Sequence, residues 1–124
     1  MSRLDGKVII ITGGTQGIGE AVALLAAKCG AEGVMICGRQ EDKGRGVATR
    51  IEELGCAVEY VPADLSIVED CRQVIRRCDE RFSRVDGLVN CAADTNRGTL
   101  EETTVEFWDY LFAVNVRAPF ILTK

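Results

Sequence analysis

Four glycines stand close together near the start of the chain, in the stretch ITGGTQGIGE at residues 11–20. Glycine at this density is unfavourable inside a helix or strand, because glycine loses more conformational freedom on ordering than any other residue. An apolar run precedes the glycines and a helical pattern follows them. Since the first N–H groups of a helix bind phosphate well, the stretch predicts a phosphate-binding turn. The plainer alternative is a glycine-rich turn without a ligand.

Three of the four glycines of this turn have an expected task. Gly13 allows the tight turn, Gly17 lets a pyrophosphate approach the backbone, and Gly19 lets the helix pack closely on the sheet. The other residues expected to contact the phosphates or the rest of a dinucleotide are their neighbours Thr12, Thr15, Gln16 and Ile18.

A second group of candidates follows the apolar stretch GVMICG at residues 33–38. At the end of such a strand a carboxylate binds the ribose 2′-OH of NAD, whereas a cation accommodates the 2′-phosphate of NADP. Here Gly38 stands where the acid is expected, and Arg39 follows it. The pair favours NADP(H). NAD(H) stays possible, because Arg39 could be a solvated loop charge and Glu41 or Asp42 could still reach a ribose.

Apolar periodicity predicts the elements that would position these residues. Strands are expected at 7–12, 33–38, 57–64 (stopping around Pro62) and 85–93. Helices are expected at 17–29, closed by Gly30, around 47–54, ended by Gly55, and at 68–82, with a capping box of Ser66 and Glu69. A last helix would start at Thr103 or Thr104 and be interrupted or bent by Pro119. The order β-α-β-α-β-α-β-α predicts an α/β fold: one Rossmann-like domain over 1–124 with a doubly wound parallel sheet.

Composition excludes several function classes. The net charge is −4, so the sequence indicates no nucleic-acid partner and no anionic membrane. The longest apolar runs fall short of the ~18 residues that a membrane-spanning helix needs, and no signal-peptide pattern is present. The chain has no histidine, and its six cysteines form no C-x-x-C pair, so we expect no metal. We expect the cysteines to be reduced core residues of a cytoplasmic protein.

Four segments together resemble the short-chain dehydrogenase/reductase family over essentially the whole chain. The glycine spacing is that family's T-G-x-x-x-G-x-G, and Asp64, next to Leu65, is similar to its acidic residue that contacts adenine. The segment NCAA at residues 90–93 resembles the family's N-N-A-G, and VN at residues 114–115 matches its supporting asparagine. Two departures are Cys91 for asparagine and Ala93 for glycine. Ala93 would be strained at a positive φ, and Cys91 is expected to be a buried, inert thiol.

The resemblance implies an NAD(P)-dependent oxidoreductase that transfers hydride between the nicotinamide and a small alcohol or carbonyl substrate. It implies that Asn90, Ala92 and Ala93 shape the cofactor pocket and that Asn115 supports the catalytic centre. Asparagine is also a poor helix former, which favours a functional reason for its place in the middle of the last expected helix. That helix often packs against its counterpart in this family, so a homodimer or homotetramer is expected.

The family's serine and Tyr-x-x-x-Lys pair are not found in the chain. Tyr60 and Tyr110 are followed four residues later by Asp64 and Val114, not by lysine. We therefore expect the acid/base residues to lie beyond residue 124, which would make the chain an incomplete domain that is inactive alone. The alternative is a dinucleotide-binding or regulatory module without catalysis.

Overall fold

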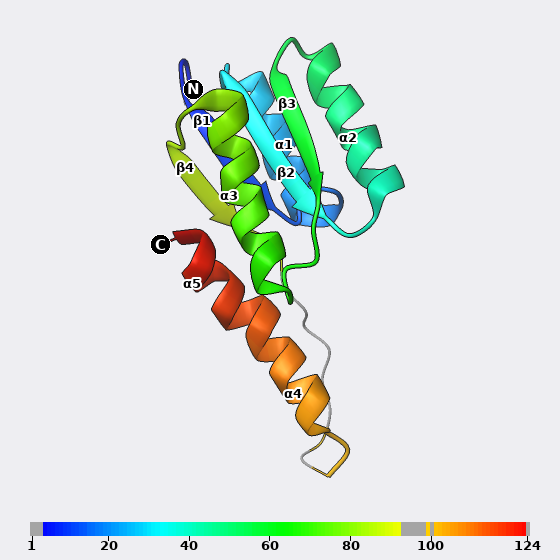
Figure 1. Ribbon diagram of the computed structural model, residues 1–124. Helices are drawn as coiled ribbons and strands as arrows, with labels where there is room; N and C mark the ends of the chain where they lie inside the picture. The colour runs from blue at the N-terminus through cyan, green and yellow to red at the C-terminus, as the bar shows by residue number, and fades with distance from the viewer. Residues whose placement is uncertain (1–3, 93–98, 100, 124) are drawn as a thin grey trace.

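The computed structural model describes residues 4–92, 99 and 101–123, and it contains four parallel strands in the order β3-β2-β1-β4. The strands are β1 (Val8–Thr12), β2 (Gly33–Gly38), β3 (Ala57–Pro62) and β4 (Gly87–Asn90). Three helices connect them: α1 (Gly17–Lys28), α2 (Glu41–Glu53) and α3 (Val68–Phe82). The parallel sheet flanked by helices confirms the Rossmann-like α/β fold expected from the sequence (Figure 1).

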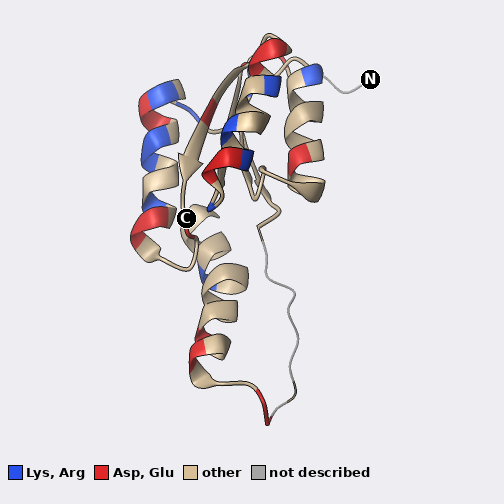
Figure 2. Cartoon of the chain, turned by 90° about the vertical axis from the view of Figure 1, so that its right-hand side faces the viewer, with Lys and Arg blue, Asp and Glu red and all other residues tan. Residues whose placement is uncertain are grey.

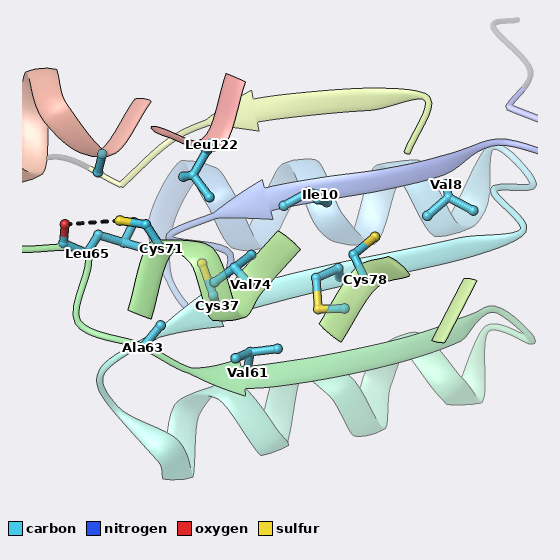
Figure 3. Close-up of a cluster of buried hydrophobic side chains, with 12 residues drawn as sticks. Val8, Ile10, Cys37, Val61, Ala63, Leu65, Cys71, Val74, Cys78 and Leu122 are labelled. Atoms are coloured by element: carbon cyan, nitrogen blue, oxygen red, sulfur yellow. Dashed lines mark hydrogen bonds between the residues drawn. The ribbon is translucent and has the colours of Figure 1, made fainter. Parts of the chain in front are cut away.

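The core has two layers, one on each face of the sheet, because successive side chains of a strand point to opposite faces. Val8 and Ile10 pack against α3, whose buried residues Cys71, Val74 and Cys78 recur at helical spacing (Figure 3). On the opposite face, Ile11 packs with residues of α1 and α2. The strands are therefore almost wholly apolar, as a parallel sheet covered on both faces requires.

Two helices end where the sequence predicts. Gly30 and Gly55 follow α1 and α2 with φ of +87° and +84°, the left-handed conformation that glycine adopts without strain. Inside α2, Gly44 has no side chain because a Cβ there would lie 2.2 Å from the Tyr60 ring. This close approach packs α2 directly onto β3.

The fourth strand is shorter than expected, covering 87–90 rather than 85–93. At its start, the Asp86 carboxylate accepts the Val8 N–H at 2.8 Å and is bound by the Arg84 guanidinium, which lowers the pKa of Asp86. At its end, the Ala92 N–H donates to the Thr12 hydroxyl at 3.1 Å instead of continuing the ladder. The side chains of Asp86 and Thr12 therefore bind backbone N–H groups at the two ends of the pairing between β1 and β4. The first strand also starts one residue later than expected, at Val8.

The expected capping box at α3 is wrong. Ile67 is the residue before the helix, and it makes no capping side-chain bond. Ser66 instead donates to Asp64, and Glu69 binds Arg76. Both side chains thus bind other residues nearby in the sequence instead of the first N–H groups of α3.

The last expected helix is continuous but has three parts: α4 (Val105–Phe112), the π-helix η1 (Ala113–Arg117) and α5 (Ala118–Thr123). Thr104 caps α4 as expected, accepting the Phe107 N–H at 3.0 Å. Pro119 does not interrupt the helix. Its ring and missing N–H are incompatible with a regular α-helix turn before it, and the wider π turn occupies that place. The helix α5 packs against α3, while α4 extends beyond the sheet and has no buried residue (Figure 1).

The cysteines differ in part from the expectation. All six are unpaired, and Cys37, Cys56, Cys71 and Cys78 are buried. Cys29 and Cys91 are only partly buried, and of these two Cys91 packs against the edge of the core. Both lie at element ends, where the chain leaves the core.

Candidate dinucleotide site

A cavity of about 360 Å³ opens at the carboxyl ends of the strands, beside the start of α1. In open α/β sheets this is the edge where ligands bind. Ten of the residues expected from the sequence line it: Gly13, Thr15, Gln16, Ile18, Gly19, Gly38, Arg39, Asp64, Leu65 and Ala92. The fold therefore brings the glycine-rich turn, the end of β2 and the loop after β3 around one space.

The glycine-rich turn is shaped by backbone approaches that exclude side chains. Gly13 has φ +67°, and a Cβ there would lie 2.9 Å from the Ala92 backbone. Gly17 has φ +59° but faces open space, with no heavy atom within 4 Å of a Cβ. An open, side-chain-free position at a helix start is where an anion can reach backbone N–H groups.

Gly19 performs a different task from the expected one. A Cβ there would lie 2.1 Å from the Gly13 carbonyl oxygen, so Gly19 lets α1 pack on the turn rather than on the sheet. Gly14 is the glycine that approaches the sheet, because a Cβ added at Gly14 would lie 2.7 Å from the Ile36 side chain. The sequence pattern identified the glycines but not this division between them.

The end of β2 is fixed by hydrogen bonds to one carbonyl. The Gly38 oxygen accepts the Tyr60 hydroxyl at 2.6 Å and the Ala63 N–H at 3.1 Å. A Cβ at Gly38 would lie 3.0 Å from Thr15, so a larger residue there would crowd the turn. Arg39 follows immediately and is exposed at the cavity.

The two acidic residues that could have competed with Arg39 do not line the cavity. Glu41 bonds Arg45 at 2.6 Å along the exposed side of α2. Asp42 lies beside it in the first turn of the same helix. The β2–α2 segment therefore presents a guanidinium and no carboxylate to the cavity.

Asp64 lies in a tightly bonded loop after β3. Its Oδ1 atom accepts the Ser66 hydroxyl at 2.6 Å and the Ser66 N–H at 2.9 Å. These bonds lower the pKa of Asp64, and the nearby positive charge of Arg39 lowers it further. The carboxylate is thus kept ionised and held in one orientation at the cavity wall.

Several candidate residues lie outside the cavity lining. Thr12 is buried at the end of β1, where its hydroxyl lies 3.5 Å from the Val89 carbonyl and accepts the Ala92 N–H. Asn90 pairs with Thr12 across the ladder. Gly17 is flanked by lining residues without being one, and Ala93 lies outside the described residues.

Asn115 is exposed within η1 and does not line the cavity, although Val114 beside it does. π-helical turns occur frequently at functional sites. The structure thus places the asparagine in an irregular helical turn next to the site.

Sequence reasoning missed six lining residues: Cys37, Gln40, Ala63, Cys91, Tyr110 and Val114. Most adjoin residues that were expected, but Tyr110 reaches the cavity from α4 and carried no local signal.

Neither a reactive thiol nor a metal cluster is indicated by the described residues of the site. Cys37 is not a candidate nucleophile, because burial raises its pKa to about 12. Within the described part of the chain, no three His, Cys, Asp or Glu residues gather as metal ligands.

Comparison with known proteins points to one family. The family model described as short chain dehydrogenase matches residues 7–124. An uncharacterized oxidoreductase of Thermotoga maritima is 38% identical over 98% of this chain, and a 3beta-hydroxysteroid dehydrogenase of Mediterraneibacter gnavus is 34% identical over 100% of it. These matches cover 47% and 45% of the two relatives, so the chain spans about half of their length.

Solved structures agree with the sequence comparison. A short chain dehydrogenase from Burkholderia cenocepacia in complex with NADP has a TM-score of 0.93 at 34% identity, covering 98% of this chain and 50% of that one. L-sorbose reductase from Gluconobacter frateurii, complexed with NADPH and L-sorbose, has a TM-score of 0.92 at 32% identity, with coverage of 98% and 46%.

Proposed function

The chain belongs to the short-chain dehydrogenase family, and on this premise we propose that the whole protein is an NADP(H)-dependent oxidoreductase acting on an alcohol or carbonyl substrate. When bound, the nicotinamide accepts or donates the hydride. In this proposal, residues 1–124 bind the dinucleotide. The single observation that carries the cofactor choice is the cavity at the start of α1, where Arg39 is the charged residue supplied by the β2–α2 segment.

The residues of this chain divide the binding between them. We assign the pyrophosphate to the backbone of residues 13–19, because the N-terminal N–H groups of α1 lie there and Gln16 makes no side-chain cap. Asp64 and Leu65 would hold the adenine end. Thr12 and Asn90 position the ends of β1 and β4. We propose that Ala92 and Ala93 shape the cofactor pocket and that Asn115 supports the catalytic centre.

Replacing Arg39 with alanine tests the cofactor choice. NADPH affinity should fall about 10-fold, because a charge-assisted bond to the 2′-phosphate is lost, whereas NADH affinity should be nearly unchanged. Titration of the whole protein with each reduced cofactor, followed by nicotinamide fluorescence, gives both constants. Arg45→Ala is the matched control, since Arg45 pairs with Glu41 and does not line the cavity. An NADPH preference that survives Arg39→Ala would contradict the assignment.

The activity itself is tested by NADPH consumption in the whole protein with a panel of ketones, aldehydes and sugars. We expect at least one carbonyl compound to be reduced, with the reverse reaction on the corresponding alcohol. Tight NADPH binding without turnover of any compound would favour the non-catalytic dinucleotide-binding module instead.

We further propose a homodimer or homotetramer. Apolar side chains form one stripe along α4, η1 and α5, with exposed fractions between 47% and 72%: Val105, Trp108, Phe112, Val116 and Phe120. The Trp108 and Phe112 rings stack with centroids 4.7 Å apart. This long helix carries few charges, in contrast to α2 and α3 (Figure 2). A contiguous apolar stripe of this kind marks a contact surface.

Trp108→Glu should shift the protein toward the monomer, because a carboxylate in an apolar interface is desolvated without a partner. Light scattering after size-exclusion chromatography, at several protein concentrations, measures the change. Glu106→Lys on the same helix, outside the stripe, should leave the assembly unchanged. A Trp108→Glu protein that stays oligomeric at all concentrations would contradict the proposal.

We also propose a cytoplasmic location. Its support is the set of six unpaired cysteines, which is typical of proteins kept in a reducing compartment. Among the described residues, no helix is both long enough and apolar enough to cross a membrane.

A further inference from the structure

A lysine from α2 reaches across to the glycine-rich turn. The Lys43 Nζ atom donates to the Gln16 side-chain oxygen at 2.6 Å, joining residues 27 positions apart. Gln16 lines the cavity, as do Arg39 and Gln40, which precede α2. The bond therefore holds an ammonium group at the rim between the start of α1 and the end of β2.

The charge of Lys43 is not neutralised by a carboxylate. Other cations of α2 are paired: Arg45 with Glu41, and Arg50 with Glu20. Within the described residues, neither Lys43 nor Arg39 forms a salt bridge, and the Lys43 partner is a neutral amide. Arg39 thus lines the cavity, and Lys43 lies next to it through its bond to Gln16, so two cations without a salt bridge stand close to the cavity. Neighbouring positive charges of this kind attract a doubly charged anion.

The position fits one particular anion. The pyrophosphate is common to NADPH and NADH and belongs at the start of α1, whereas the 2′-phosphate attaches to the ribose at the end of β2. Arg39 is at the end of β2, and Lys43 is one helical turn further along the same segment. Its side chain is exposed, so it can leave Gln16 for a stronger acceptor without opening the core.

We propose that Lys43 is a second cation for the adenosine 2′-phosphate, held ready at the rim by Gln16 and acting together with Arg39. This inference rests on the proposed NADP(H) function and names a further specificity-determining residue for it. A guanidinium supplies a planar fork to the phosphate, and the ammonium supplies a mobile point charge on its other side.

Lys43→Gln tests this role in the whole protein. NADPH affinity should fall about 5-fold while NADH affinity changes less than about 2-fold, because only NADPH carries the extra phosphate. Lys43→Arg should keep the NADPH preference. The fragments adenosine 2′,5′-bisphosphate and AMP, used as competitors, should show the same contrast. Added salt should weaken NADPH binding less in Lys43→Gln than in the native protein, since one fewer ionic contact is screened.

Lys28→Gln is the matched control: it removes the same charge from the end of α1, away from the cavity, and should leave both affinities unchanged. Equal losses of NADPH and NADH affinity in Lys43→Gln would overturn the inference, because Lys43 would then act on the glycine-rich turn. An unchanged NADPH preference would overturn it as well, while leaving the proposed function intact. A native protein without any NADPH preference would overturn both.

Discussion

Gly19→Ala is expected to destabilise the whole protein by about 3 kcal/mol and to abolish dinucleotide binding at ordinary cofactor concentrations. The reason is a backbone contact. The new methyl group would lie 2.1 Å from the Gly13 carbonyl oxygen, and a backbone atom cannot move aside as a flexible side chain can. The start of α1 must therefore separate from the turn. Urea unfolding followed by circular dichroism, together with NADPH titration, measures both effects.

Gly46→Ala is the matched control for this change. Gly46 also lies inside a helix, α2, but a Cβ there meets no atom within 4 Å. Alanine should stabilise that helix by about 0.5–1 kcal/mol, because it loses less backbone entropy than glycine. If both substitutions had the same effect, the close contact at Gly19 would not be the cause, and the explanation would be wrong.

Gly17→Ala is expected to weaken NADPH and NADH binding alike, by about 100-fold or about 2.7 kcal/mol. The methyl group would project into the open space at the start of α1, where the pyrophosphate must approach the backbone. Alanine at the φ of +59° found here also costs about 1–2 kcal/mol of stability. The loss of cofactor affinity must therefore be distinguished from the loss of stability that backbone strain causes.

Gly55→Ala is the control that shows the effect of backbone strain alone. Gly55 has φ +84°, faces open space and lies at the end of α2, outside the cavity. Its replacement should cost a similar amount of stability and leave the affinity for either cofactor unchanged. Similar affinity losses in the two variants, measured by titration well below the unfolding temperature, would rule out a phosphate contact at Gly17.

Much of the fold is encoded by local patterns. The β-branched run that forms β1 and the apolar spacing of α3 each specify an element through burial of one face or both. Gly30 and Gly55 end their helices because the chain needs a left-handed residue there. The spacing of the glycines likewise located the glycine-rich turn, because Gly13 and Gly17 also have a positive φ. These signals depend on residues close together in the sequence.

The features that the sequence did not reveal depend on which atoms meet in the folded chain, whether the two residues are close in sequence or far apart. Thr12 ties β1 to Ala92, Gly19 meets Gly13 across the turn, and Ser66 bonds Asp64 instead of capping α3. Tyr110 lines the cavity from α4, although its own sequence segment carries no binding motif. No local propensity encodes such approaches.

The sequence by itself therefore determined the order of strands and helices and the position of the glycine-rich turn, and it is the source of the proposal that Arg39 selects the cofactor. The tertiary structure decided which residues surround one cavity and that Lys43 bonds Gln16. It also decided that Glu41 pairs with Arg45 and does not line the cavity. The physical reason is that periodicity and turn chemistry act within a few residues. A binding site is instead made where segments separated by tens of residues are packed together by burial of the two apolar faces of the sheet.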